Sequence, residues 1–347
     1  MLRYEICFHP SWWHKTAGID FSESFWYDPE VRIQADMVMR RILFEKFGEF
    51  GLGEKNPLPR PLLGSDNTAC GFLLSELLGC KVLYAADDSP QVICAKLGDN
   101  EAFALQVPDL DTSPVWQKIQ IQLDYLKNTY GYVESHMNLS GVQNLAIDLR
   151  GQDLFMDYYD EDSPAQHLLE VACETMLRAG RRLHAYTPHL SGGVTNILNH
   201  VAPENFCTGN CTVEMVSQQI YEQFLLPYDN RLAGEFTHFG IHHCGRTMEH
   251  VVNGYAKVQN LKFVEVGAFS DLKTVRDALP RDMLINARYS PVRLATVDYE
   301  DLRAELEEMV RLVPENRLSI SCVGIDASVP EEKIRWFLSI CRELLTQ

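Results

Sequence analysis

The chain has 347 residues, of which 46% are apolar and 23% charged, a composition typical of a soluble globular protein with a full core. Its length fits one large α/β barrel or two smaller domains. The formal net charge of −17 argues against a protein that binds the phosphate backbone of nucleic acids, because no basic stripe is available for it.

The cysteines and the N-terminal residues indicate the cellular compartment of the protein. Ten cysteines are scattered along it, and the first residues, MLRYEICFHPSWWHK, lack the apolar core of a secretory signal. This combination indicates reduced thiols in the cytoplasm rather than a disulfide framework. No uninterrupted apolar run approaches the ~18 residues that span a bilayer. We therefore expect a cytoplasmic protein without a membrane partner.

Taken in chain order, the first expected elements are a helix over 30–50, preceded by Pro29, a strand over 81–85 and a helix over 117–128. From about residue 131 short β-type runs alternate with amphipathic helical segments. The expected strands are 132–138, 182–187, 205–209, 236–242, 262–266, 283–287 and 318–322. The expected helices between them are 165–179, 213–224, 247–258, 270–279, 299–312 and 330–345.

This alternation predicts βα units and a parallel sheet. Seven runs, with one more strand missed, favour a closed (β/α)8 TIM barrel over a doubly wound sheet. We expect a single domain over 1–347. Within it, residues up to about 100 would form an N-terminal extension that caps the barrel mouth, and 101–347 would form most of the barrel.

The stretch Ile241-His242-His243-Cys244-Gly245 carries the clearest chemical signal. His242 and Cys244 are close enough in sequence to point at one ion, and imidazole and thiolate are ligands that zinc favours. With the distant Cys322 they give three protein ligands and an open fourth position, the arrangement of catalytic zinc. Glu265, a carboxylate inside the apolar run 263–266, needs a partner, and a metal could supply it.

All four of these residues fall at or just after the ends of predicted strands, the face where barrel enzymes place their chemistry. We therefore predict a zinc site of His242, Cys244 and Cys322, with Glu265 as a ligand that substrate displaces. Glu265 and His243 are the predicted catalytic residues, although His243 should orient or pack rather than bind metal.

Other candidates carry less information. Cys207 and Cys211 form a second pair, which we interpret as structural because no further His or Cys lies nearby in sequence. His184 and His189 are at another predicted strand end, where they would line the pocket or serve a core or surface role. The predicted substrate contacts are Trp12, Trp13 and His14, which could fold over the barrel mouth, together with His136 and Asn210.

Four segments then point to a known family: GCKV at 79–82, SGVQ at 140–143 with LRG at 149–151, VSQQIYEQFLLPY at 216–228, and HHCG at 242–245. They resemble the uroporphyrinogen decarboxylase superfamily, and within it the zinc-dependent, corrinoid-linked methyltransferases such as those acting between methyl-cobalamin and coenzyme M. The resemblance covers nearly the whole chain, and it implies a (β/α)8 barrel.

The decarboxylases of this superfamily carry a Pro-x-Trp-x-Met-Arg-Gln-Ala-Gly-Arg signature whose arginines hold carboxylates. The matching stretch here begins at Pro10, and its two arginine positions are Lys15 and Ile19. Lysine cannot reproduce the bidentate grip of a guanidinium group, and isoleucine cannot hold a carboxylate. The resemblance therefore favours the methyltransferase branch over decarboxylation.

In that branch a His-x-Cys pair and a distant cysteine hold zinc, with a nearby glutamate as an exchangeable ligand. The resemblance maps these roles onto His242, Cys244, Cys322 and Glu265. It implies transfer of a methyl group between a small methylated substrate, or a thiol acceptor, and the cobalt of a corrinoid carried by a separate protein. The alternatives are a porphyrinogen-type decarboxylase and a non-catalytic corrinoid or tetrapyrrole binder.

Overall fold

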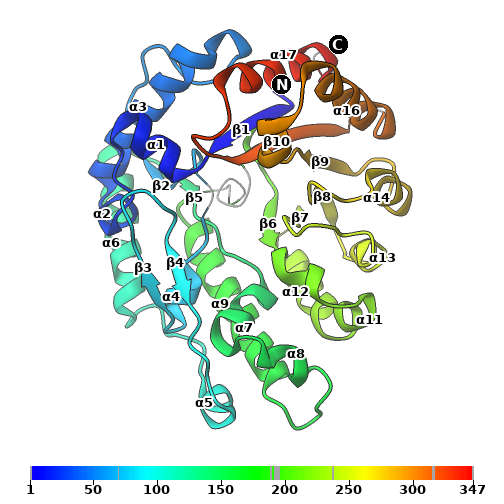
Figure 1. Ribbon diagram of the computed structural model, residues 1–347. Coiled ribbons are helices and arrows are strands. Elements are labelled where there is room, and N and C mark those ends of the chain that lie inside the picture. The colour runs from blue at the N-terminus through cyan, green and yellow to red at the C-terminus, as the bar shows by residue number, and fades with distance from the viewer. Residues whose placement is uncertain are drawn as a thin grey trace.

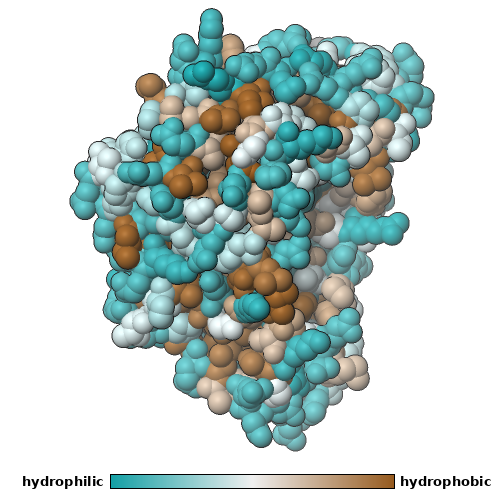
Figure 2. All heavy atoms as spheres, turned by 60° about the vertical axis from the view of Figure 1, so that its left-hand side comes forward, coloured by the Kyte–Doolittle hydropathy of each residue, from teal (hydrophilic) through white to brown (hydrophobic). Residues whose placement is uncertain are grey.

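The computed structural model describes residues 2–68, 70–187, 190, 196–236, 238–314 and 317–345. Within these ranges no helix is long and apolar enough to cross a membrane. His189 lies outside the described residues. The face of the molecule seen in Figure 2 is mostly hydrophilic, with separate hydrophobic patches.

A curled, parallel six-stranded sheet organises the molecule, in the order β1-β10-β9-β8-β7-β6 (Figure 1). Its strands are β1 (Tyr4–Phe8), β6 (Phe206–Gly209), β7 (Phe239–His242), β8 (Leu261–Val266), β9 (Leu284–Arg288) and β10 (Leu318–Ile325). Every neighbouring pair is parallel, so the carboxyl ends of all six strands meet at one edge. The sheet confirms the mixed α/β class and gives half of a barrel.

Two further strands, β2 (Leu62–Gly64) and β5 (Glu134–His136), form a separate parallel pair. The carbonyl of Ser140, which follows β5, accepts a 2.7 Å hydrogen bond from the backbone N–H of Gly209 at the end of β6. A Cβ on Gly141 would lie 2.0 Å from the Gly209 carbonyl oxygen, so this close approach requires glycine. The carboxyl ends of β5 and β6 therefore lie together. The closed eight-stranded barrel stays a prediction.

Helices pack outside the curled sheet (Figure 1). The α-helices are α1 (Pro10–Ala17), α2 (Glu23–Tyr27), α3 (Pro29–Phe47), α4 (Leu73–Leu77), α5 (Asp99–Ala104), α6 (Pro114–Tyr130), α7 (Val142–Arg150), α8 (Asp153–Asp157), α9 (Ala165–His184), α10 (Leu198–Val201), α11 (Gln218–Ile220), α12 (Leu226–Glu235), α13 (Val252–Tyr255), α14 (Leu272–Ala278), α15 (Pro291–Thr296), α16 (Tyr299–Leu312) and α17 (Glu331–Leu345). Single turns of other helix types are η1 (Gly48–Phe50), η2 (Cys211–Met215) and η3 (Tyr221–Leu225).

The helices predicted over 30–50 and 117–128 are confirmed as α3 and α6. The Asp28 carboxylate begins α3, because it accepts hydrogen bonds from the N–H groups of Glu30 and Val31. Pro29 occupies the first helical position, where its missing N–H costs nothing.

The predicted strand at 182–187 is wrong, because α9 continues through this run to His184. Met176, Ala179 and Leu183 extend the buried stripe of the helix at spacings of three and four residues. Burial of that stripe stabilises the helix more than the local sequence at its end favours a strand. The predicted strand 81–85 exists only as β3 (Lys81–Leu83), which pairs antiparallel with β4 (Gln91–Ile93) outside the main sheet.

The N-terminal strand β1 was not predicted. All five of its residues are buried, and Tyr4 is in register with Ile320 of β10. Tyr4–Phe8 thus belong to the sheet and do not merely cover it, although they fall within the predicted extension. That the segment up to about residue 100 otherwise forms a cap stays a prediction.

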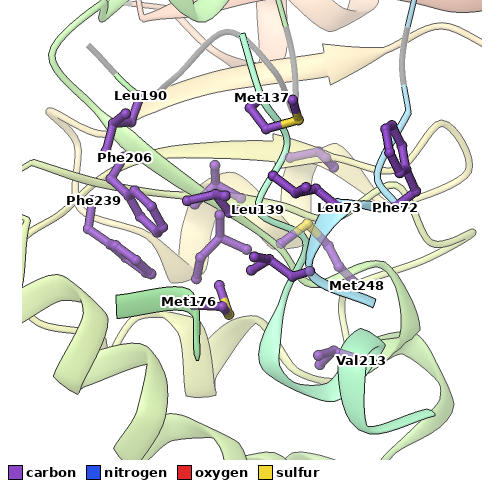
Figure 3. Close-up of a cluster of buried hydrophobic side chains, with 14 of the residues drawn as sticks. Phe72, Leu73, Met137, Leu139, Met176, Leu190, Phe206, Val213, Phe239 and Met248 are labelled. Atoms are coloured by element: carbon purple, nitrogen blue, oxygen red, sulfur yellow. The ribbon is translucent and has the colours of Figure 1, made fainter. Parts of the chain in front are cut away.

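Between the sheet and α9 lies part of the main hydrophobic core (Figure 3). The rings of Phe206 on β6 and Phe239 on β7 stack with their centroids 6.1 Å apart, and Met176 of α9 is in the same cluster. This packing fixes β6 and β7 side by side, and both strands lead directly into the candidate site.

Candidate metal centre

Two loops that leave neighbouring strands bring a pair of cysteines together. Gly209 at the end of β6 is in register with His242 at the end of β7. Cys211 and Cys244 each lie two residues beyond this matched pair, so equal offsets place them side by side. Gly267 supports the second loop, because a Cβ there would lie 1.8 Å from the carbonyl oxygen of Gly245.

The donor atoms of Cys211, His242 and Cys244 all lie within 4.8 Å of one another. The two Sγ atoms are 2.7 Å apart, and both cysteines are free thiols. Cys244 is exposed, whereas only 9% of His242 is exposed, so the group reaches solvent through Cys244. Two sulfurs and an imidazole nitrogen form a donor set that suits zinc and leaves one position open for substrate.

Behind this group, Glu265 is fully buried and its Oε2 lies 2.7 Å from Nδ1 of His242. Nε2 is therefore the ring nitrogen that remains for a metal. Arg288 extends this row of contacts, since its Nε lies 3.4 Å from Oε1 of Glu265. A carboxylate bonded to the far nitrogen of a metal-binding histidine fixes the ring and strengthens its donor nitrogen.

Burial and neighbouring charges determine which of these groups are protonated without a metal. Burial disfavours the charged ring of His242, but the Glu265 carboxylate and Cys244 outweigh it and raise the pKa of His242 to about 10. The contact with Cys244 holds the pKa of Cys211 below its usual value, and the same contact together with burial raises the pKa of Cys244. The pair thus favours one thiolate, and a metal would displace the proton of the other.

The expected result of Glu265→Gln is a zinc affinity about 10- to 100-fold weaker than that of the unchanged protein. The amide keeps the size of the side chain and removes the charge that strengthens His242 as a donor. Competition with a chromophoric chelator measures the affinity. The matched control is Glu249→Gln, a carboxylate outside the donor set whose Oε1 accepts from the backbone N–H of Asp271, and it should leave the zinc affinity unchanged.

Cys322 is not brought to this group. The hydroxyl of the preceding Ser321 accepts a 2.8 Å hydrogen bond from Asn286, which is in register with Glu265. These three side chains therefore share one face of the sheet, and Cys322 points to the other face. There it is fully buried in the main core, and burial, together with the nearby Cys322 thiol, raises the pKa of Cys341 on α17. Burial raises the pKa of Cys322 itself to about 12.

His243 also points away from the metal group. Its Nδ1 lies 2.8 Å from the hydroxyl of Tyr255, and its Nε2 lies 3.0 Å from the carbonyl oxygen of Thr247. Since a carbonyl only accepts, Nε2 carries the proton and Nδ1 accepts from the tyrosine. Burial lowers the pKa of His243 to about 4. Both contacts position the loop, in line with the predicted orienting role of His243, and its catalytic role stays a prediction.

The aromatic residues predicted as a lid make core contacts. Trp12 is 8% exposed and stacks on Phe8 with ring centroids 3.8 Å apart. Trp13 is 1% exposed and donates from Nε1 to the carbonyl of Asn67. His14 lies with its Nδ1 2.8 Å from the carbonyl oxygen of Ile19. Their role as substrate contacts stays a prediction.

Asn210, also predicted to contact substrate, supports the loop, and its role as a substrate contact stays a prediction. Its Nδ2 donates a 2.8 Å hydrogen bond to Asp229, which also accepts from the hydroxyl of Tyr221. Burial raises the pKa of Asp229 to about 6 despite these bonds. Asn210 immediately precedes Cys211, so this buried network holds the cysteine at the carboxyl-end edge of the sheet. His136 lies elsewhere, at the end of β5.

Cys211 is the site residue that sequence reasoning missed. A usable signal was present, since the strand 205–209 was predicted and Cys211 lies two residues beyond its end, as Cys244 lies two residues beyond β7. The absence of a nearby His or Cys in sequence was misleading, because the partners come from the neighbouring strand.

No family model matches the chain, and no curated protein matches it either. Among solved structures, a methyltransferase from Methanosarcina mazei is similar with a TM-score of 0.64 and 14% identity, over 98% of this chain and 93% of that one. A B12-independent methionine synthase from Shewanella sp. W3-18-1 is similar with a TM-score of 0.52 and 11% identity, over 100% and 97% of the two chains. The chain shares their fold. This shared fold agrees with the fold class that the resemblance implies.

Proposed function

We propose that this protein is a zinc-dependent methyltransferase that moves a methyl group between a small substrate and the cobalt of a separate corrinoid protein. The observation that carries the proposal is the convergence of Cys211, His242 and Cys244 within 4.8 Å at the carboxyl ends of β6 and β7. The shared fold with the Methanosarcina methyltransferase supports the reaction class.

The donor set fits zinc, because two sulfurs and one imidazole converge and a buried carboxylate orients the imidazole. Bound zinc would supply Lewis acidity, which lowers the pKa of a substrate thiol or polarises the oxygen of a methyl ether. Cys211 and Cys244 would hold the ion, and Glu265 would keep Nε2 of His242 aimed at it. Glu265 would then be an orienting residue, not a ligand that substrate displaces.

The proposal includes a closed eight-stranded barrel, in which the pair β2–β5 fills the space between β1 and β6. The hydrogen bond between Ser140 and Gly209 supports this placement on one side. Such a barrel would present the metal group at its carboxyl-end mouth, where a partner protein can approach the exposed Cys244.

A second candidate is methylation of a thiol without a corrinoid, which the similarity to the B12-independent methionine synthase favours. Decarboxylation of a porphyrinogen is weaker, because Lys15 lacks the bidentate guanidinium group and Ile19 is apolar and buried in the main core. A corrinoid or tetrapyrrole binder without catalysis is the remaining alternative, and it leaves the donor set without a role.

Methyl transfer from methylcobalamin to a panel of small thiols, followed by the cobalamin absorbance, tests the proposal. We expect turnover that falls by at least about 100-fold, or about 2.7 kcal/mol in activation free energy, after chelation and returns when zinc is restored. Turnover unaffected by complete removal of metal would contradict the zinc role. Thiol methylation from a folate donor, with none from methylcobalamin, would favour the second candidate.

A further inference from the structure

A cavity of about 580 Å³ lies at the opposite end of the strands from the metal centre. Arg60, Tyr132 and Pro203 in its lining precede β2, β5 and β6 in the chain, and the lining reaches inward past these short strands to Asp66 and to His136, the last residue of β5. Cys211 and Cys244 instead follow the carboxyl ends of β6 and β7. Because the strands are parallel, the cavity and the metal centre open at different ends of the molecule.

The two fully paired carboxylates of the cavity wall, Asp36 and Asp66, are matched by two guanidinium groups, because Nε of Arg40 also lies 2.8 Å from Asp36. Nη2 of Arg60 lies 2.8 Å from the Asp66 carboxylate and 2.6 Å from that of Asp36, and its Nη1 lies 3.8 Å from Glu134. Lys127, the other cation of the lining, is exposed to solvent. Burial raises the pKa of the remaining carboxyl, Glu134, which favours its neutral form, so the described part of the lining favours an uncharged ligand over an ion.

Neutral hydrogen-bonding groups remain available. Asn199 donates from Nδ2 to Nδ1 of His136 over 3.3 Å, which leaves the proton of the imidazole on Nε2 as a donor. Burial lowers the pKa of His136 and of His200, so both rings are neutral at pH 7. Neutral imidazoles and amides both donate and accept, which matches hydroxyl groups on a ligand.

Flat apolar surfaces complete the lining. Tyr132 and Tyr186 both contribute to it, and Tyr132 is 49% exposed. The hydroxyl of Tyr186 donates to Asp124 over 2.7 Å and accepts from Gln120, so its ring is held in place. Fixed aromatic rings favour a flat partner, because planar faces stack with little loss of conformational freedom.

We propose that this cavity is a second binding site, which takes an uncharged, flat molecule bearing hydroxyl groups, of the phenol type. The volume is within the range of about 300–1,000 Å³ typical of small-molecule sites. Compensated charges, neutral donors and tyrosine rings select this class over ions and over flexible apolar molecules. The site is independent of the metal centre and of the activity proposed for it.

Calorimetric titration with resorcinol tests the proposal on the full chain. We expect a dissociation constant below about 1 mM for resorcinol, and binding at least about 10-fold weaker for cyclohexane-1,3-diol, which lacks the flat ring, and for benzoate, which is charged. His200→Trp, which fills the opening, and His136→Ala, which removes a donor, should each weaken resorcinol binding at least about 10-fold.

Two control variants separate this site from the rest of the molecule. His250→Trp places the same bulk on an exposed histidine outside the cavity, and Cys211→Ala removes a thiol from the metal centre. Neither should change the dissociation constant of resorcinol. The proposal is overturned if resorcinol does not bind at 10 mM (on the order of ten times the expected constant), if the cavity variants bind as the unchanged protein does, if Cys211→Ala abolishes binding, or if benzoate binds more tightly.

Discussion

Cys211→Ser is expected to lower the zinc content from about one ion per chain to less than about a tenth of that value, and to reduce methyl transfer at least about 100-fold. A serine hydroxyl keeps the shape of the side chain but is a far weaker zinc ligand than a thiolate. Cys244→Ser should behave in the same way, because the two sulfurs lie 2.7 Å apart and serve one ion. Elemental analysis of the purified proteins measures the loss.

Cys322→Ser is the informative control, since this cysteine was the predicted third ligand but lies on the opposite face of β10 from Ser321. It should keep its zinc and its methyl transfer, and lose only some stability because a polar hydroxyl replaces a fully buried thiol. Cys207→Ser is a second control, because Cys207 is buried below the site in a separate apolar cluster. Loss of zinc from Cys322→Ser with full zinc in Cys211→Ser would reverse the assignment.

Arg32→Ala is expected to lower the free energy of unfolding by about 3–5 kcal/mol, the largest effect on stability that we expect away from the site. Arg32 is fully buried in α3, and its guanidinium donates to the carbonyls of Leu62 and Trp26 and to the side chain of Gln122. The substitution leaves those acceptors without donors and opens a cavity among α2, α3, α6 and β2. Urea denaturation followed by circular dichroism measures the change.

Arg41→Ala provides the matched control on the same helix. Arg41 is exposed, and its removal should change the free energy of unfolding by less than about 0.5 kcal/mol. Equal effects of the two substitutions would show that the buried hydrogen bonds of Arg32 contribute nothing beyond helix propensity.

The elements that the sequence predicted well are those whose patterns are local. Pro29 marks the first position of α3, where the Asp28 carboxylate accepts hydrogen bonds from N–H groups within three residues. The alternation of strands with amphipathic helices after residue 131 predicted five strands of the main sheet. The run 182–187 failed because α9 buries a stripe that continues through Leu183. The local pattern of this run is compatible with a strand, but burial of the helical stripe in the core favours the helix.

The candidate site was only half predictable, for a reason that lies in strand geometry. His242 and Cys244 are close in sequence, and Glu265 is buried in an apolar strand, so a local pattern marks all three. The choice of the third thiol depends on register and on the face toward which each side chain points. Ser321 and Cys322 are adjacent in the sequence, yet Ser321 faces Asn286 and Cys322 faces α17. A single sequence does not show which face of the strand each side chain takes until the pairing of the strands is known.

The most direct test of the metal centre is X-ray diffraction from crystals of the zinc-loaded protein at wavelengths on either side of the zinc absorption edge. The account predicts one anomalous peak per chain, about 2.3 Å from each of the Sγ atoms of Cys211 and Cys244 and about 2.0 Å from Nε2 of His242. A peak bonded to Cys322, or no peak among these three side chains, would contradict it.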